Sequence, residues 1–315
     1  MAEHLVSIII PVFNRASFLE TTLNSIRGQS YLNWECILID DHSTDDSWEI
    51  LKEFEDLDSR FKVFKRPDNK PKGANACRNF GFENAEGKYI NFFDSDDLME
   101  HNFLENKIIS FQEYTDLVLS KTKIHYPEEQ KDYFESRTQL TSNVLEDFIT
   151  RKISWYLPDP MYLKSFLDEH QIKFDEQLLG GQDRDFFQRI LLVEPLIIIV
   201  NEYLTTYIKH GSSISEKIYK QGDFKVSVSR VSALLGFINL LESKNRLSGN
   251  LKFFYIKELR KMIPLVYIDS RSRNALLKTL LKLSDLNLNT FKSWIKIGVG
   301  LISLKITGKG QKLFK

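Results

Sequence analysis

Three carboxylates in four residues end a hydrophobic segment of the chain, at Asp94, Asp96 and Asp97. Residues 88–93 before them are rich in aromatic and β-branched side chains, a pattern that favours a strand buried on both faces. Because an unpaired buried carboxylate is costly, we expect the acids at the carboxyl end of this strand, in a cleft. The spacing Asp-x-Asp suits a divalent cation such as Mg²⁺ or Mn²⁺, which in turn suits a diphosphate. The alternative is that Asp96 or Asp97 caps a helix beginning near Met99, and the two roles are compatible.

Charge is balanced over the whole chain and unbalanced along it. The 315 residues include 43 Lys or Arg and 43 Asp or Glu, which gives no reason to expect a nucleic-acid partner. Residues 250–315 hold 14 basic and 3 acidic residues, so this segment carries a net charge of +11 and residues 1–249 carry −11. The two parts therefore suit different surroundings.

The sequence favours a cytoplasmic protein. Cys36 and Cys77 are the only cysteines, and both lie in apolar or helical patterns typical of small buried thiols, which fits a reducing compartment. The first residues lack the basic leader and the cleavage site of a signal peptide. We expect no membrane-spanning helix, since no stretch reaches the roughly 18 apolar residues required.

Strand and helix patterns alternate four times in the first hundred residues. Hydrophobic segments, the most continuous of them at residues 5–12, predict strands at residues 5–12, 34–39, 61–64 and 88–93, and helical spacing predicts helices from about residues 17, 48 and 74. This alternation predicts an α/β layer with a mostly parallel sheet. Right-handed crossovers would then bring the carboxyl ends of the strands, with their acids, to one edge.

The pattern is less regular after Asp97. We expect a helix at 103–111, a strand at 116–125, a charged surface segment at 128–137 and a short helix at 144–149. Trp155, Tyr156 and two prolines interrupt a helix that resumes near Leu163. Further along, the sequence predicts a helix around 186–191, strands at 196–200 and 204–207, and helices from about residue 218 onward.

Four motifs together resemble one enzyme family. They are PVFN at residues 11–14, IDDHSTDDS at 39–47, Gly73-x-x-x-x-Arg78-Asn79-x-Gly81, and AEGKYINFFDSDD at 85–97. In this order they resemble the family 2 glycosyltransferases, which have the GT-A fold. The similarity runs over roughly residues 5–100 and continues more weakly from GGQDRDFFQRI at 180–190 to HGSSIS at 210–215. The last hundred residues fall outside it.

The resemblance implies an α/β fold of the GT-A type, a Rossmann-like nucleotide-binding sheet with helices on both faces, followed by a C-terminal helical tail. It implies a glycosyltransferase domain at residues 1–214, with a nucleotide-binding half at 1–100 and an acceptor half at 101–214. Residues 215–315 would then form a helical, basic C-terminal region.

The resemblance also implies a site for the nucleotide of the donor. Pro11, Val12, Phe13 and Asn14 would cradle the nucleotide, and Asp41 would accept the N3–H of uracil in a charge-assisted bond. The alternative for Asp41, and for Asp40 before it, is to cap the following helix. Two cations near the same edge, Lys72 and Arg78, would contact phosphate or would be solvated.

In the family the Asp-x-Asp pair holds a Mn²⁺ or Mg²⁺ ion. The resemblance implies that Asp96 binds the ion directly, while Asp94 contacts ribose or sugar hydroxyls or the waters of the ion, with Ser95 between them. Asp97 matches an extra acid that is frequent in the family, and we expect it to cap a helix. His210 sits where family members carry a residue near the diphosphate, so it would bind metal or phosphate; the alternative is a structural histidine.

Inversion at the sugar carbon requires one base that takes a proton from the acceptor hydroxyl. The matching motif is Gly181-Gln182-Asp183, which implies that Asp183 is the base, with Asp185 as the second candidate. Gln182 departs from the family pattern, in which Glu is common at this position. The alternative is that both acids belong to the first turn of a helix, where they complement its dipole. Trp155 would wall the acceptor site or be buried in the core.

These features predict an inverting transfer of a sugar from a UDP-sugar to a saccharide or lipid-linked saccharide, in the synthesis of surface polysaccharide or glycan. One alternative is a nucleotidyltransferase of sugar phosphates, but that class needs a glycine-rich loop after the first strand, and residues 11–18 contain no glycine. The other alternative is a non-catalytic sugar-nucleotide-binding protein.

The basic end of the chain interleaves Lys with Leu, Ile, Phe and Trp over residues 291–315. A helix of this composition can lie on an anionic membrane surface, which would place the protein on the inner face of the membrane, near a lipid-linked acceptor. The alternative is that it packs on the acidic first part of the chain or on another subunit of a homo-oligomer.

Overall fold

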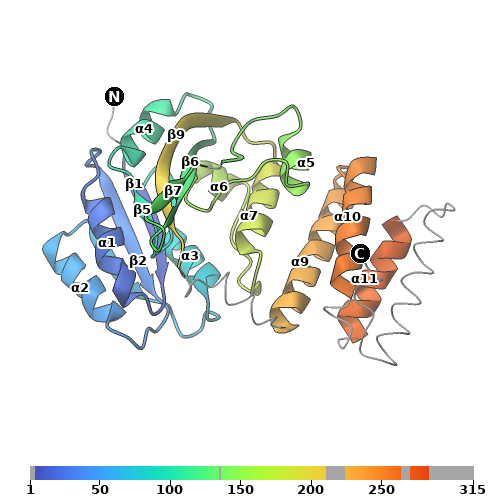
Figure 1. The fold of residues 1–315 in the computed structure, drawn as a ribbon, viewed down its shortest axis with the longest axis horizontal. Helices are drawn as coiled ribbons and strands as arrows, with labels where there is room; N and C mark the ends of the chain where they lie inside the picture. Colours follow the sequence, from blue (N-terminus) through green and yellow to red (C-terminus); the bar gives the residue numbers. More distant parts are fainter. Residues whose placement is uncertain (1–3, 135, 211–223, 264–269, 284–315) are drawn as a thin grey trace. The chain divides into compact units, whose positions relative to one another are not determined.

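A computed structural model describes residues 4–134, 136–210, 224–263 and 270–283. The chain divides into two compact units (Figure 1). The first contains residues 1–176 and 182–213, and the second contains residues 177–181 and 214–315. The short segment 177–181, which the sequence placed in the first domain, groups with the second unit.

A nine-stranded mixed sheet forms the first unit, with the strand order β3-β2-β1-β4-β8-β6-β9-β5 and with β7 paired to β6. The strands are β1 (Val6–Val12), β2 (Trp34–Asp40), β3 (Phe61–Lys65), β4 (Tyr89–Phe92), β5 (Leu98–Met99), β6 (Leu117–Tyr126), β7 (Lys131–Tyr133), β8 (Pro160–Leu163) and β9 (Ile197–Ile208). The first four in this order are parallel, as predicted. β8 runs antiparallel to both of its neighbours, β4 and β6.

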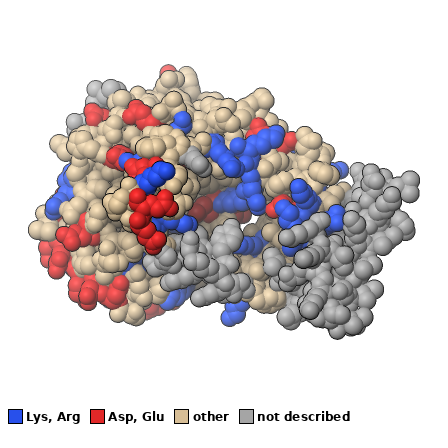
Figure 2. Space-filling view, in the orientation of Figure 1, with Lys and Arg blue, Asp and Glu red and all other residues tan. Residues whose placement is uncertain are grey.

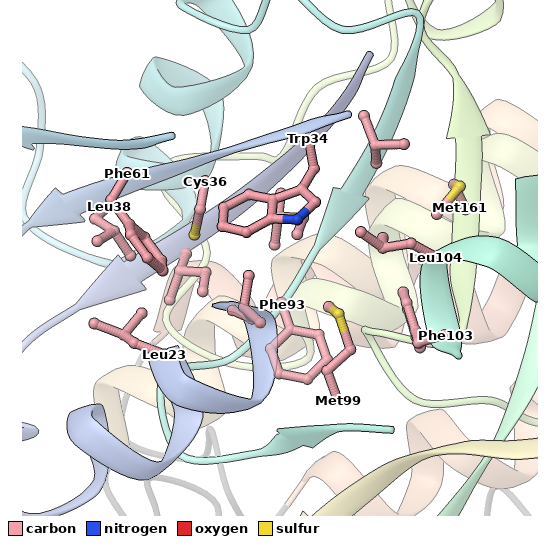
Figure 3. Close-up of a cluster of buried hydrophobic side chains, with 14 of the residues drawn as sticks. Leu23, Trp34, Cys36, Leu38, Phe61, Phe93, Met99, Phe103, Leu104 and Met161 are labelled. Carbon is pink, nitrogen blue, oxygen red and sulfur yellow. The ribbon is translucent and has the colours of Figure 1, made fainter. Parts of the chain in front are cut away.

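Helices cover both faces of this sheet, as predicted. They are α1 (Ala16–Arg27), α2 (Ser47–Leu57), α3 (Ala74–Glu83), α4 (Phe103–Ser110), α5 (Val144–Ile149), α6 (Lys164–Glu169) and α7 (Gln182–Leu191). One core cluster packs side chains of α1, α2 and α4 on the sheet and includes Trp34, Phe93 and Phe103 (Figure 3). On the other face Phe92 of β4 packs edge to face on Phe186 of α7. Both layers are apolar because the central strands are buried on both sides.

The register of the central strands sets the edge on which the site is built. Val12 at the end of β1 pairs with Asp40 at the end of β2, and Ile9 pairs with Phe92 at the end of β4. All three strands are parallel, so their carboxyl ends lie at the same edge of the sheet. This edge carries the PVFN motif, the Asp40-Asp41 pair and the Asp94–Asp97 acids.

Gly87 permits the close approach of β4 to β1. A Cβ atom at this position would lie 2.6 Å from the backbone nitrogen of Ser7 and 2.9 Å from the carbonyl oxygen of Leu5. Backbone atoms in a paired strand cannot move aside, so the two strands would have to separate. The glycine therefore fixes the spacing of the strands that end in the site.

We expect Gly87→Ala to lower the stability of the first unit by about 1–3 kcal/mol through overpacking. The midpoint of thermal unfolding should fall by several degrees. Gly236→Ala in α9 (Phe224–Ser243) is the control, because no atom lies within 4 Å of the added Cβ. An unchanged midpoint for Gly87→Ala would contradict the steric argument.

One helix prediction and one pair of strand predictions were wrong. Residues 160–163 form β8, where the sequence favoured an interrupted helix; pairing with two neighbouring strands overrides the local pattern, and Pro160 is tolerated as the first residue of the strand. The two strands expected at 196–207 are one continuous strand, β9. The helix expected at 103–111 is confirmed as α4, whereas no helix begins near Met99, as the capping alternative required, because Leu98 and Met99 form β5.

The described part of the second unit contains three helices: α9, α10 (Gly249–Met262) and α11 (Ser270–Leu283). The expectation that no helix could span a membrane is wrong by length and composition, since α9 has 20 residues and a mean hydropathy of 1.4 over its apolar window. A mostly buried core helix of a soluble protein passes the same test by length and composition. In α9, 28% of the apolar window is buried inside the structure.

The described part of the first unit has an acidic surface and two buried cysteines, as the sequence predicted. Acidic side chains gather over the surface formed by α2 (Figure 2), whose sequence includes Glu49, Glu53 and Asp56. Both cysteines are buried, and burial raises the pKa of the Cys77 thiol to about 12. The proposed membrane-binding segment 291–315 lies outside the described residues.

Candidate active site

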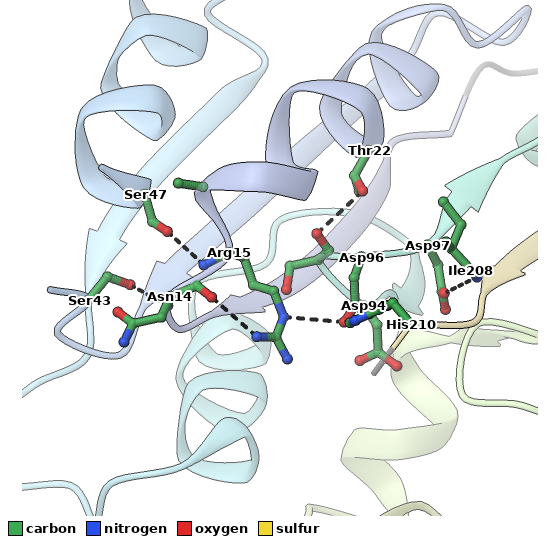
Figure 4. A network of polar contacts seen from close by, with 12 residues as sticks. Asn14, Arg15, Thr22, Ser43, Ser47, Asp94, Asp96, Asp97, Ile208 and His210 are labelled. Carbon is green, nitrogen blue, oxygen red and sulfur yellow. Dashed lines mark hydrogen bonds and ion pairs between the residues drawn. The ribbon is translucent and has the colours of Figure 1, made fainter. Parts of the chain in front are cut away.

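The end of β1 turns sharply toward the β2–α2 loop. Asn14 has a φ of 51°, a left-handed conformation that Asn tolerates better than most residues. Its backbone N–H donates to Ser43 Oγ at 3.0 Å, and its Oδ1 accepts from the backbone N–H of Thr44 at 2.8 Å (Figure 4). The neighbouring Pro11 and Val12 are buried within β1. Phe13 and Asn14 are therefore the members of the motif that present side chains at the edge.

Phe13 and Lys72 come together, although 58 residues separate them. The Lys72 ammonium lies 4.0 Å from the centroid of the Phe13 ring, in cation–π geometry, and the ring is 38% exposed. The loop at residues 66–73 thus lies beside the end of β1. An aromatic face with a cation next to it suits a nucleotide, which has a flat base and charged phosphates.

Asp41 is buried and paired with a cation that the sequence analysis missed. Arg66 Nε donates to Asp41 Oδ1 at 2.5 Å, and both side chains are less than one-tenth exposed. Asp40 accepts from the backbone N–H of Ser43 at 3.2 Å. Neither acid caps α2, whose N-cap position is Asp46. The available signal was that Arg66 directly follows β3, the strand next to the one that ends in Asp40.

Arg78 on α3 joins the two groups of acids predicted to do chemistry. Its Nη2 donates to Asp94 Oδ1 at 2.8 Å, and its Nη1 lies 4.0 Å from Asp183 Oδ1. The guanidinium is 6% exposed and packs on the ring of Phe174 at 5.2 Å. In this structure its partners are therefore carboxylates and an aromatic ring.

The acids after β4 have three different environments. Burial raises the pKa of Asp94 to about 6; Arg78 opposes this shift, while the charges of Asp183 and Asp96 add to it. Asp96 lies between an arginine and a histidine: its Oδ2 is 3.2 Å from Arg15 Nε and 3.1 Å from His210 Nε2 (Figure 4). Ser95 between them is buried, and its carbonyl accepts from Thr22 Oγ1 at 3.3 Å.

Asp97 does not cap a helix, and that prediction was wrong. Its Oδ1 accepts from the backbone N–H of Ile208, at the end of β9, at 3.3 Å. The N-cap position of α4 is Asn102. Burial raises the pKa of Asp97 well above its usual range, and the charges of Asp94 and Asp96 raise it further. The buried acid ties β9 to the acidic loop, and β9 delivers His210 two residues later.

His210 lies within contact of Asp96, 114 positions earlier in the chain. Its ring also packs on Phe18 of α1, with a centroid distance of 4.4 Å. The contact with Asp96 joins the PVFN end of β1, through Arg15, to the end of β9. The carboxylate and the imidazole are both ligand types for a transition metal.

The donor set at this point fits a divalent cation in part. Within the described ranges no three His, Cys, Asp or Glu side chains form a metal-binding group. Asp96 and His210 converge to 3.1 Å, whereas the hydrogen-bond partner of Asp94 is Arg78. Mg²⁺ in nucleotide sites is commonly held by one or two carboxylates and the phosphates of the substrate, so two side chains are sufficient. The imidazole favours Mn²⁺ over Mg²⁺.

Asp183 and Asp185, both in the first turn of α7, differ in their environments. Asp185 is 14% exposed and receives two hydrogen bonds from Arg189, at 2.9 and 2.6 Å. Asp183 is 49% exposed, and its buried Oδ1 accepts no hydrogen bond from the residues that the structure describes. Gly181, with a φ of 77°, turns the chain directly before the helix. Asp183 is therefore the carboxylate of this pair that is available to an incoming hydroxyl.

A cleft of about 480 Å³ opens beside β6. It is lined by Ile124, Phe134, Ser136, Arg137, Thr138, Ser154 and Tyr156. Trp155 does not belong to it: the indole is 9% exposed and packs on Phe148 and Phe187 in the core. The neighbouring Tyr156 is 37% exposed and stacks on Tyr207, three residues before His210 on the same chain segment.

Buried polar side chains hold the loop that carries Tyr156. Asp159 Oδ2 accepts from the backbone N–H of Tyr156 at 2.7 Å, and its Oδ1 accepts from Thr122 at 2.6 Å. Lys107 Nζ donates to the carbonyls of Pro158 and Asp159 at 3.1 and 2.6 Å. Burial raises the pKa of Asp159 to about 6 and lowers that of Lys107 to about 7. The Tyr156 ring is therefore fixed in place rather than carried on a loosely attached loop.

Known proteins resemble this chain in sequence and in fold. The chain is 39% identical over 104 residues to the putative teichuronic acid biosynthesis glycosyltransferase TuaG of Bacillus subtilis (strain 168), covering 33% of this chain and 40% of TuaG. It spans between 25% and 65% of the length of other curated glycosyltransferases that it matches.

Two solved structures share the fold. The first is S. aureus TarS 1–349 in complex with UDP-GlcNAc, with a TM-score of 0.57 and 19% identity over 86% of this chain and 89% of that chain. The second is the mannosyltransferase PcManGT from Pyrobaculum calidifontis in complex with GDP-Man and Mn²⁺, with a TM-score of 0.54 and 14% identity over 96% of this chain and 86% of that chain. These likenesses establish the GT-A fold.

The family assignment rests on a match over residues 7–191 and not on single motifs. The family model described as glycosyl transferase family 2 matches residues 7–191, which is more than half of the chain. The match begins in β1 and ends at the last residue of α7, so it includes the PVFN motif, the Asp94–Asp97 acids and Asp183. The protein belongs to glycosyl transferase family 2.

Proposed function

We propose that the protein is an inverting glycosyltransferase that moves a sugar from a UDP-sugar to a saccharide or lipid-linked saccharide acceptor. The observation that carries the proposal is the position of Arg78 between Asp94 at 2.8 Å and Asp183 at 4.0 Å. Arg78 holds a donor-side acid and a half-exposed carboxylate at one point of the site. The donor sugar would lie next to Asp94, and Asp183 would face the acceptor.

Asp183 would act as the general base. Its half-exposed carboxylate would accept the proton of the acceptor hydroxyl as the hydroxyl oxygen bonds to the sugar carbon and the diphosphate leaves from the opposite face. Asp185 is poorly placed for this role, because Arg189 holds its carboxylate. Arg78 would keep Asp183 oriented and would partly balance its charge.

The donor would lie along the edge formed by β1, β2 and β4. Phe13 and Lys72 would contact the base and phosphate, and Asp41 would accept the N3–H of uracil with its charge fixed by Arg66. Asp96 and His210 would hold a Mn²⁺ or Mg²⁺ ion, which when bound neutralises charge on the leaving diphosphate. TarS and PcManGT bind different nucleotides, so the fold admits both; the choice of UDP rests on Asp41.

The proposal is tested by measuring nucleotide release from a panel of UDP-sugars and GDP-mannose, with and without Mn²⁺. We expect release from one or more UDP-sugars, slower without the cation, because slow hydrolysis reports the donor even when no acceptor is present. Release from GDP-mannose alone would contradict the assignment of Asp41. Binding of UDP-sugars with no release under any condition would favour a non-catalytic binding protein.

We place the acceptor in the cleft beside Tyr156. Exposed rings and hydroxyl groups suit a saccharide, whose C–H faces stack on aromatic rings and whose hydroxyls form hydrogen bonds. The name of TuaG refers to teichuronic acid biosynthesis. This supports the proposal that the acceptor is an intermediate in the synthesis of a cell-surface polysaccharide. We propose a cytoplasmic location at the inner face of the membrane, where residues 291–315 would contact anionic lipid.

Tyr156→Ala should separate acceptor binding from donor chemistry. Loss of the ring should raise the KM for the acceptor about tenfold, since an aromatic contact contributes about 0.5–1.5 kcal/mol, and should leave donor hydrolysis unchanged. The matched control is Tyr114→Ala, which removes a ring that is 73% exposed outside the cleft. Equal losses of transfer and hydrolysis would show that Tyr156 supports the fold of the site instead.

A further inference from the structure

Arg15 occupies the carboxylate oxygen at which a cation would bind. Its Nε lies 3.2 Å from Asp96 Oδ2, the same oxygen that lies 3.1 Å from His210 Nε2 (Figure 4). The Arg15 and Asp96 side chains are 14% and 15% exposed. The sequence motifs did not identify Arg15, which directly follows PVFN. Among the Lys and Arg side chains that the structure describes, it is the one that forms an ion pair with Asp96.

Hydrogen bonds fix the backbone of Arg15, whereas its guanidinium can bind either a carboxylate or a phosphate. The backbone N–H donates to Ser47 Oγ at 2.8 Å, and the backbone N–H of Ala16 donates to Asp45 Oδ2 at 3.1 Å. The guanidinium also donates from Nη1 to the carbonyl of Asn14 at 3.2 Å. Arg is suited to either a carboxylate or a phosphate, since its planar donors match both.

A divalent cation and the Arg15 guanidinium cannot both sit close to Asp96 Oδ2 without repulsion. Two like charges a few ångströms apart in a partly buried site repel strongly. A cation arriving alone must therefore displace Arg15 and leave it without an anion. A cation arriving with a nucleoside diphosphate supplies Arg15 with a new one.

We propose that Arg15 couples the binding of the divalent cation to the binding of the donor diphosphate. In the donor-free protein Arg15 holds Asp96 and weakens the affinity for the cation. When the diphosphate binds, Arg15 transfers from Asp96 to a phosphate oxygen, and Asp96 becomes available to the cation. The proposal rests on the cation and nucleotide site of the proposed function and adds an order of events to it.

This coupling has a thermodynamic signature that is independent of catalysis. If UDP raises the affinity for Mn²⁺ by some factor, Mn²⁺ raises the affinity for UDP by the same factor. Removing Arg15 should strengthen Mn²⁺ binding in the absence of UDP and should weaken UDP binding in the presence of Mn²⁺. The coupling factor should therefore fall.

The experiment measures Mn²⁺ affinity of the full chain by electron paramagnetic resonance, with and without UDP. For Arg15→Met we expect about a tenfold tighter donor-free affinity, equivalent to about 1.4 kcal/mol, and at least a tenfold smaller coupling factor. Arg15→Lys keeps the charge and should lie nearer to the wild type. Arg27→Met is the control, because it removes the same charge at the other end of α1, about 18 Å away at 1.5 Å per residue, and should change neither quantity.

Each other outcome overturns the proposal in an identifiable way. Unchanged or weaker donor-free Mn²⁺ binding by both Arg15→Met and Arg15→Lys would show that Arg15 supports Asp96 rather than competing for it. A wild-type Mn²⁺ affinity that does not depend on UDP would exclude the coupling and leave the transferase assignment intact. No Mn²⁺ binding by the wild type even with UDP would also remove the cation from the proposed function.

Discussion

Asp183→Asn is expected to lower the rate of sugar transfer by about 10²–10⁴-fold, the usual contribution of a general base, while UDP binds as it does to the wild type. Asn has the same shape as Asp and keeps an oxygen near Arg78, so the site should retain its geometry. It cannot accept the proton of the acceptor hydroxyl. Transfer is measured by UDP release in the presence of acceptor, and binding is measured by calorimetry.

The neighbouring acid provides the matched control for this variant. Asp185→Asn changes the same atoms two residues later, but there the carboxylate binds Arg189 within α7. We expect it to reduce the melting temperature and to retain transfer within a few-fold per folded molecule. If Asp183→Asn lost UDP binding and transfer equally, its role would be structural, and the assignment of the base would be wrong.

The first half of the fold could be predicted because its signals are local. Each parallel strand from β1 to β4 is a short apolar run, and each is separated from the next by an amphipathic helix. β8 could not be predicted in this way, because residues 160–163 become a strand through pairing with β4 and β6 on either side. Long-range pairing of this kind leaves little trace in a four-residue pattern.

The same distinction applies to the site. Asp94, Asp96 and Asp183 could be proposed from their motifs, since each motif is a continuous piece of chain. The partners of these acids are distant in sequence: His210 contacts Asp96 across 114 positions, and Arg66 contacts Asp41 across 25. Arg15 and Arg66 are ordinary cations in the sequence. Only the register of the strands, which places their carboxyl ends side by side, makes them part of the site.

Arg78 illustrates how the structure changes the meaning of a motif. The sequence left it open whether Arg78 contacts phosphate or is solvated; its guanidinium is not solvated but lies buried between Asp94 and Asp183. A buried cation between two acids lowers the cost of bringing those acids together. The motif Arg78-Asn79 on α3 is therefore connected to Asp183 on α7 as well as to Asp94. Asn79 strengthens this connection, because it donates to the carbonyl of Phe174 at 2.9 Å, beside the ring on which Arg78 packs.

Asp96→Asn is the second variant with a large expected effect. The substitution keeps the size of the side chain and removes the negative charge at the point where Arg15 and His210 meet. The cation should then bind much more weakly, and the diphosphate should lose the charge stabilisation that the cation supplies when bound, which amounts to several kcal/mol. We expect transfer to fall by at least about 10²-fold. UDP affinity measured with Mn²⁺ should fall to the value measured without it.

Three measurements decide whether this effect arises from the cation. In the wild type, EDTA should lower both UDP affinity and transfer, whereas in Asp96→Asn it should change neither, because the cation is already absent from the site. Asp168→Asn is the control, since that acid pairs with Lys164 on the surface of α6 and should respond to EDTA as the wild type does. If wild-type transfer persists in EDTA, the cation is not required. The charges of Arg15 and Lys72 would then have to stabilise the leaving diphosphate, and Asp96 would serve to position Arg15 and His210.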